Sequence, residues 1–255
     1  MNAYFVHEVR FMIRTCFRFA LVGGLVALGS GCPDAASTPC IIQSPLLGGY
    51  TVRITLQGTP PAGCENVLPP VYGDIWKMDT FPGNSIVTHP ISMPYADRGG
   101  DPDHNPLGTG TLSEEPDTQS YCYIPTLTEM RGDVDPLGLG PGQETYSIVA
   151  SNLTFLDGAK YQGAQFEGDA TITFGSCTGS YKILAVTPGQ LFCATDIDCS
   201  PFGNPDAGIF IGSGMNPEFA VSCVTEPWVE FLPNPDPDAT PGTCFLSNPF
   251  PSLAQ

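Results

Sequence analysis

Hydrophobic and polar residues alternate along several short segments of this 255-residue chain. In residues 50–56, YTVRITL, every second residue is apolar, and those between them are threonine or arginine. Residues 168–176, GDATITFGS, repeat the pattern, with Ala170, Ile172 and Phe174 on one face. Because successive side chains of a β-strand point to opposite faces, both segments are predicted to be half-buried strands.

Other segments also have the composition of strands. They are residues 146–155, 181–186, 208–212, 219–224 and 228–232, with weaker candidates at 75–78, 86–88 and 121–124. The turn-forming segment GSCTGS, between Phe174 and Tyr181, predicts an antiparallel hairpin. Helix is expected to be scarce, because 27 prolines and 29 glycines interrupt nearly every segment. The predicted fold class is all-β, an antiparallel sandwich or a barrel-like domain.

Composition shifts suggest where the domain begins and ends. A β domain is expected over residues 44–188, with a long polar loop over 94–142, of a length that is usually functional or disordered. Residues 189–255 hold four cysteines and fewer core-forming residues, which indicates a disulfide-stapled, cysteine-rich C-terminal segment. A leader over 1–31 and a linker over 32–43 precede the β domain.

An apolar run near the N-terminus indicates export. Fourteen uncharged residues extend from Phe19 to Cys32, whereas a membrane-spanning helix needs about 20 residues and a signal-peptide core roughly 7 to 15. Arg10, Arg14 and Arg18 precede the run, as in the basic start of a signal peptide. Residues 1–31 are therefore predicted to be a secretory leader, starting at either Met1 or Met12.

The residues that end the leader resemble the lipobox of bacterial lipoproteins. The matching residues are Leu28, Ser30, Gly31 and Cys32. The resemblance implies that Cys32 carries lipid, becomes the mature N-terminus and anchors the protein to a membrane of the cell envelope. Lipoproteins with aspartate after this cysteine tend to stay at the inner membrane, so Pro33 implies the outer membrane. The alternative is ordinary cleavage, for instance after Ser37, which would leave a soluble periplasmic or secreted protein.

Cysteine parity agrees with export into an oxidising compartment. Of ten cysteines, Cys16 leaves with the leader, and lipidation of Cys32 leaves an even set of eight. Four disulfides are therefore expected among them, although eight cysteines allow 105 pairings. The eight are Cys40, Cys64, Cys122, Cys177, Cys193, Cys199, Cys223 and Cys244. Zinc is not expected, because the chain after the leader has only two histidines and no CxxC pair.

The segment CATDIDC, residues 193–199, resembles a C-x-x-D-x-D-C element of cysteine-rich exported bacterial proteins. In the structural interpretation, Asp196 and Asp198 accept hydrogen bonds from nearby backbone amides; calcium binding is the alternative. In keeping with this element, the four C-terminal cysteines are expected to pair among themselves. The remaining pairs would then be Cys40 with Cys64 and Cys122 with Cys177.

The charge of the chain excludes one class of partner. Without Arg10, Arg14, Arg18 and Glu8 of the leader, six basic and twenty-five acidic residues remain, a net charge of about −19. Phosphate backbones repel such a chain, so no nucleic-acid partner is expected. Calcium would relieve the repulsion, and Asp101, Asp103 and Asn105 have the one-three-five spacing of a calcium loop. Asp-Pro turns are the alternative, and Asn234, Asp236 and Asp238 repeat the spacing.

Catalytic motifs do not stand out. The chain has no GxSxG or SxxK motif, and its histidines lie in no recognisable setting, so triad chemistry is not expected. Carboxylate pairs suit a glycosidase, and the candidates are Glu114, Glu115, Glu226 and Glu230. The leading hypothesis is a non-catalytic, envelope-anchored structural or binding module without a cofactor, contacting a protein or carbohydrate. The alternatives are a secreted carbohydrate-active hydrolase and a calcium-dependent adhesion module.

Overall fold

The computed structural model describes residues 39–42, 49–93, 105–133, 145–157, 163–189, 192–207, 213–224 and 242–253. The chain divides into two compact units, residues 1–37 and 38–255, and every described residue lies in the second. The predicted leader and Cys32 lie outside the described residues, as do the strands predicted at 208–212 and 228–232.

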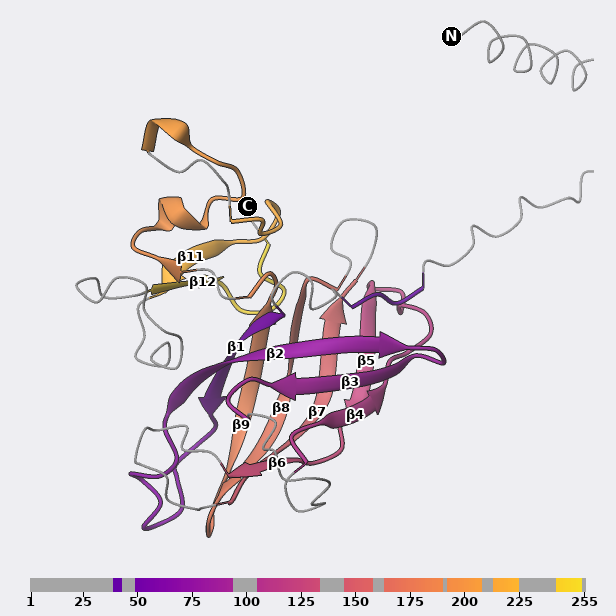
Figure 1. Ribbon diagram of the computed structural model, residues 1–255, viewed down its shortest axis with the longest axis vertical. Coiled ribbons are helices and arrows are strands. Elements are labelled where there is room, and N and C mark those ends of the chain that lie inside the picture. The colour runs from indigo at the N-terminus through magenta and orange to yellow at the C-terminus, as the bar shows by residue number, and fades with distance from the viewer. Residues whose placement is uncertain are drawn as a thin grey trace, which may run out of the picture. The chain divides into compact units, whose positions relative to one another are not determined.

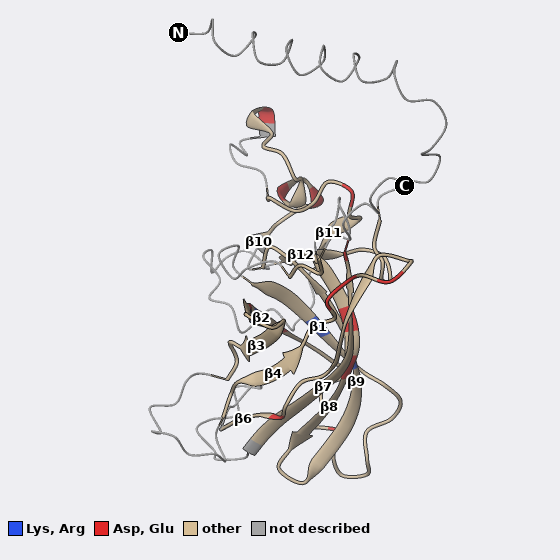
Figure 2. Cartoon of the chain, turned by 90° about the vertical axis from the view of Figure 1, so that its right-hand side faces the viewer, with Lys and Arg blue, Asp and Glu red and all other residues tan. Residues whose placement is uncertain are grey.

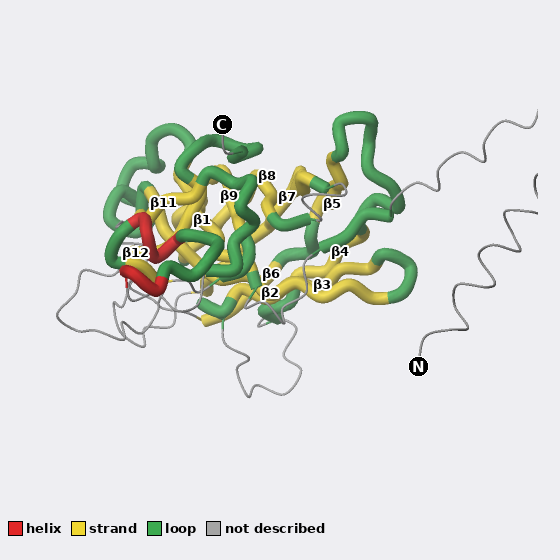
Figure 3. Tube along the Cα trace, turned by 90° about the horizontal axis from the view of Figure 1, so that it is seen from above, coloured by secondary structure: helices red, strands yellow, loops and turns green. Residues whose placement is uncertain are grey.

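One antiparallel sheet dominates the described chain (Figure 1). Its order is β4-β3-β2-β1-β9-β8-β7-β5, and β6 also pairs with β7. The strands are β1 (Tyr50–Leu56), β2 (Val71–Phe81), β3 (Ser85–Pro90), β4 (Gly108–Thr111), β5 (Tyr121–Thr126), β6 (Met130–Asp133), β7 (Thr145–Leu156), β8 (Gln165–Phe174) and β9 (Cys177–Val186). Seen from above, the strands follow one another around a ring (Figure 3). The all-β prediction is confirmed in its barrel-like form.

Hydrogen bonds join the two ends of the strand order and nearly close the sheet. Thr128 donates its N–H to the carbonyl of Thr109 in β4 at 2.8 Å, and Ser113, just beyond β4, donates its N–H to the Tyr123 carbonyl of β5 at 2.9 Å. Gly110 allows this approach, because a Cβ there would lie 2.9 Å from both the Thr126 carbonyl oxygen and the Ile124 side chain. The absence of a side chain at Gly110 is therefore a requirement of closure.

Aromatic side chains fill much of the interior of the sheet. Tyr50 and Phe155 pack against Phe166 with ring centroids 5.0 and 4.8 Å apart, and Trp76 packs against it at 6.3 Å. All four side chains are fully buried. These residues alternate with outward-facing ones, as the period-two pattern of β1 predicts.

One disulfide lies at each end of the large sheet. Cys122 lies opposite the inward-facing Phe155 and bonds to Cys40, whereas Cys177 lies opposite Phe174 and bonds to Cys64. The expected pairs Cys40–Cys64 and Cys122–Cys177 are therefore wrong. The physical reason is the length of the sheet: Phe155 pairs with Phe166, which lies eight residues from Phe174 along β8, or roughly 27 Å. Cys40 and Cys64 therefore lie at opposite ends of the sheet, and so do Cys122 and Cys177.

The C-terminal segment forms a small sheet of its own. β10 (Phe192–Cys193), β12 (Gly242–Leu246) and β11 (Val221–Val224) pair in that order, beside the 3-10 helices η3 (Asp196–Cys199) and η4 (Pro205–Ala207). The disulfides Cys193–Cys223 and Cys199–Cys244 staple it, so the prediction that these four cysteines pair among themselves is confirmed.

This segment also covers part of the outer face of the large sheet. Thr51, Val186 and Gln165 share one outward-facing row at the Cys122 end, yet each is at most 1% exposed. Ser252 donates its N–H to the Gln165 side chain at 3.2 Å, and Phe245 belongs to the same buried cluster as Val186. This part of the outer face is therefore buried beneath the C-terminal segment.

The predicted polar loop over 94–142 contains more structure than the sequence suggested. Only residues 121–124 were expected to form a strand there, but β4, β5 and β6 all lie within it. Similarly, GSCTGS was expected to be a turn, whereas β8 and β9 are joined by Gly175 and Ser176 alone. Gly175 has a positive φ of 57°, which suits the first residue of a two-residue hairpin loop. The predicted hairpin itself is confirmed.

Candidate functional site

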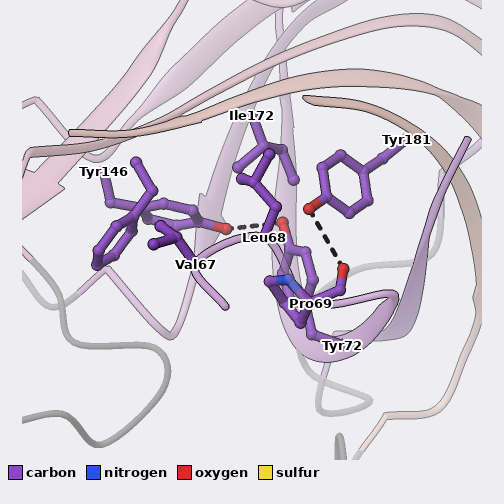
Figure 4. A pocket seen from close by; sticks show the side chains of 8 residues that line it. Val67, Leu68, Pro69, Tyr72, Tyr146, Ile172 and Tyr181 are labelled. Carbon is purple, nitrogen blue, oxygen red and sulfur yellow. Dashed lines mark hydrogen bonds between the residues drawn. The ribbon is translucent and has the colours of Figure 1, made fainter. Parts of the chain in front are cut away.

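A small cavity lies inside the sheet at the Cys177 end, and three tyrosines contribute to its wall (Figure 4). Tyr72 comes from β2, Tyr146 from the start of β7 and Tyr181 from β9. The other lining residues are Val67, Leu68, Pro69, Ile172 and Phe174. The segment between β1 and β2, which the Cys64–Cys177 disulfide holds at this end, supplies the first three of these.

The tyrosine hydroxyls are paired within this apolar environment. The hydroxyls of Tyr72 and Tyr146 are hydrogen-bonded at 2.7 Å, and Tyr181 donates to the Pro69 carbonyl at 3.3 Å. Burial raises the pKa of Tyr72 and Tyr146 well above 10.0 and that of Tyr181 to about 12. The tyrosines therefore stay neutral and act as hydrogen-bonding groups at physiological pH.

A buried carboxylate lies on the same inner face. Asp74 of β2 lies two residues from Tyr72, and Val52, opposite it on β1, is fully buried. The carboxylate accepts the Ser92 hydroxyl at 2.6 Å and the backbone N–H groups of Ile75 at 2.7 Å and Ser92 at 3.2 Å. Burial nevertheless raises the pKa of Asp74 from 3.8 to about 6, although these hydrogen bonds oppose the shift. Asp74 thus fixes the turn after β3.

The size of the cavity limits what this site can hold. Its volume is about 20 Å³, enough for about one water molecule. A buried carboxylate with a raised pKa is a feature of many active sites, but hydrogen-bonded structural networks have it too. Here Ile75 and Ser92 donate three hydrogen bonds to Asp74 and hold it to the turn after β3, so the arrangement suits a structural network.

The Cys-Asp element has the geometry of its structural interpretation. Asp198 accepts the backbone N–H groups of Ala194 and Thr195, both at 2.8 Å, and these bonds lower its pKa. Asp196 accepts the N–H of Cys223 at 2.7 Å, which ties the loop to β11. Figure 2 shows acidic residues on both η3 and η4.

The structure describes only part of the predicted calcium site. Asp101 and Asp103 lie outside the described residues, as do Asn234, Asp236 and Asp238. The Asn105 side chain accepts the N–H of Leu107 at 3.1 Å, which is an Asx-type turn. Among described residues, each cluster of potential metal ligands contains disulfide-bonded cysteines, which have no thiolate to donate.

The candidate carboxylates and histidines are also only partly described. Glu114 and Glu115 are adjacent and exposed, whereas Glu226, Glu230 and His104 lie outside the described residues. His89 forms a hydrogen bond between its Nε2 and the Met93 carbonyl at 2.5 Å, and burial lowers its pKa. The structure thus brings none of the described candidates together as a catalytic pair.

Sequence reasoning missed the interior polar residues. In VYGDIWKM, residues 71–78, Tyr72, Asp74, Trp76 and Met78 alternate with outward-facing residues. The available signal was an acidic residue at an inward position of an otherwise apolar face. Such a residue must be desolvated, so it marks either a polar network or a functional group.

The fold and the site define a disulfide-stapled, all-β protein with a filled, nearly closed sheet. Residues 50–188 match the family model MlpA, and the chain belongs to that family. A Myxococcus xanthus protein named "Putative lipoprotein MlpA" is 28% identical over 114 residues, which are 45% of this chain and 45% of that protein. The match thus spans less than half the length of this curated relative. No solved structure matches the chain.

These comparisons support the resemblance to bacterial lipoproteins, and they agree with a location in the cell envelope. Within the part of the chain that the structure describes, no helix is long and apolar enough to cross a membrane.

Proposed function

We propose that this protein is a lipid-anchored, non-catalytic module of the outer membrane that binds a protein or carbohydrate partner through its surface. The observation that carries the proposal is the filled interior. The fully buried side chains of Trp76, Phe155 and Phe166 occupy the space in which a barrel-like protein would hold a ligand. A partner must therefore contact the loops, the ends or the outer face.

The disulfides suit a scaffold that presents such a surface. Each adds about 2–4 kcal/mol of stability by restricting the unfolded chain. Two of them fix the ends of the large sheet, and two fix the C-terminal segment. Some apolar side chains remain outside the core, with Phe202 68% and Phe81 50% exposed. These positions offer contacts to a partner.

Metabolic labelling with a palmitate analogue tests the anchor. The wild-type protein should be labelled and fractionate with membranes, whereas Cys32→Ala should lose both properties. Cys16→Ala is the matched control, because Cys16 lies inside the predicted leader, and its labelling should equal that of the wild type. Equal labelling of the wild type and Cys32→Ala would refute the anchor.

Membrane fractionation tests the outer-membrane assignment separately. The wild-type protein should sediment with outer membranes. Because an aspartate after the lipidated cysteine retains lipoproteins at the inner membrane, Pro33→Asp should move the protein there. Wild-type protein in the inner-membrane fraction would contradict this part of the proposal while leaving the anchor intact.

A further inference from the structure

The segment 39–42 is fixed to one end of the large sheet by three contacts. Cys40 bonds to Cys122 at the start of β5, and its N–H is donated to the Glu114 carbonyl at 3.1 Å. The next residue, Ile41, donates its N–H to the buried Asp157 carboxylate at 2.6 Å. These contacts place the N-terminal attachment of the described chain at the Cys122 end.

The start of β1 lies at this same end. Thr51 pairs with Val186, Val186 with Gln165, and Gln165 with Leu156, which pairs in turn with Tyr121 beside Cys122. The β8–β9 hairpin, with Ser176 in its loop, lies at the opposite end. The Cys40–Cys122 disulfide and the start of β1 therefore both lie at the end of the sheet opposite this hairpin.

The disulfide sets the length of the tether between the lipid and the sheet. Cys40 follows Cys32 by eight residues, which span at most about 29 Å when extended. Without the disulfide and its neighbouring hydrogen bonds, the first strand residue is Tyr50, eighteen residues after Cys32. That tether could extend to about 65 Å. The disulfide and the hydrogen bonds beside it thus shorten the maximum reach by more than half.

We infer that the Cys40–Cys122 disulfide is a short membrane mount: it keeps the Cys122 end of the sheet, where the C-terminal segment also packs, within about 29 Å of the lipid bilayer and directs the β8–β9 hairpin end away from it. The inference rests on the proposed lipid anchor at Cys32. The hairpin end lies roughly 27 Å farther along β8 than the mounted end, so the two ends differ clearly in their distance from the bilayer.

Energy transfer on vesicles tests this orientation. The full-length lipidated protein, purified from envelopes, is reconstituted into phosphatidylcholine vesicles that contain an acceptor lipid. A fluorescent amino acid replaces exposed Gln119, near Cys122, or exposed Ser176 in the hairpin loop. Transfer should be strong from position 119 and weak from position 176. Equal transfer from both positions, or stronger transfer from position 176, would overturn the inference.

Two double variants separate the mount from general stability. Replacing both Cys40 and Cys122 by serine should reduce the contrast between the two probes, because the tether lengthens. Replacing both Cys64 and Cys177 by serine removes a disulfide at the other end and should leave the contrast unchanged. Full contrast in the first variant would refute the role of the disulfide.

The wild-type comparison tests the orientation even if a variant fails to fold. Failure of the wild-type protein to associate with vesicles would instead refute the lipid anchor, and the inference with it. Association without contrast would refute the inference alone.

Discussion

Replacing Asp74 with asparagine should stabilise the protein at neutral and alkaline pH. The carboxylate is buried, and it accepts hydrogen bonds from the N–H groups of Ile75 and Ser92 and from the Ser92 hydroxyl. Asparagine has nearly the same shape, and its carbonyl oxygen can accept both N–H groups. Its amide can donate to the Ser92 oxygen in place of the hydrogen bond that the Ser92 hydroxyl now donates, so the change removes the charge and keeps these three contacts.

The magnitude follows from the raised pKa of Asp74. A change from 3.8 to about 6 costs about 3 kcal/mol of folding free energy whenever the carboxylate is ionised. Because the folded state binds the proton more tightly, this cost is absent below about pH 4, grows between pH 4 and 6, and is complete above pH 6. The advantage of Asp74→Asn at pH 8 should thus exceed that at pH 4 by about 2–3 kcal/mol.

Guanidinium unfolding followed by tryptophan fluorescence, from pH 4 to pH 8, measures this difference. Asp79→Asn is the matched control, because Asp79 lies on the same strand but is exposed, and its replacement should change the stability little. A stability difference between Asp74→Asn and the wild type that does not change with pH would refute the reasoning. So would a variant that is less stable than the wild type at pH 8.

Three further predictions concern the sheet and its staples. Gly110→Ala should destabilise the protein by about 1–3 kcal/mol, because its Cβ meets the facing strand, whereas the exposed neighbour Thr111→Ala should have little effect in the same denaturant titration. Asp198→Ala should cost about 1 kcal/mol by thermal unfolding at pH 7, and less once acid protonates the wild-type carboxylate, whose pKa is lowered. Mass spectrometry of unreduced peptides should find Cys64 linked to Cys177, and a Cys40–Cys64 peptide would contradict the described topology.

The sequence predicted those parts of the fold that depend on local pattern. The alternation in β1 and β8 places apolar side chains inside, and the turn formers near Gly175 specify the hairpin. β4 escaped prediction because its sequence, GTGT, has no apolar residue. Its role is to allow close approach of the facing strand, and this role depends on residues far along the chain.

Local sequence patterns could not predict the disulfide pairing or the interior site, for a related reason. Proximity in sequence suggested Cys40 with Cys64, but β1 runs between them and carries the chain from one end of the sheet to the other. Similarly, Tyr72 and Tyr146 meet only because the sheet curves until β2 faces β7 across its interior. Both features follow from closure of the sheet, which no single segment encodes.

The region that matches the family model, residues 50–188, is smaller than the compact unit of residues 38–255. A fragment limited to residues 50–188 would lack the C-terminal segment that packs over Val186 and Gln165 on the outer face, and it would lose Cys40 and the last two disulfides. Its largest sheet would then expose an apolar patch to solvent and carry an unpaired thiol at Cys122. Such a fragment should aggregate on expression, so boundaries for recombinant work belong at the edges of the cysteine set rather than at the limits of sequence similarity.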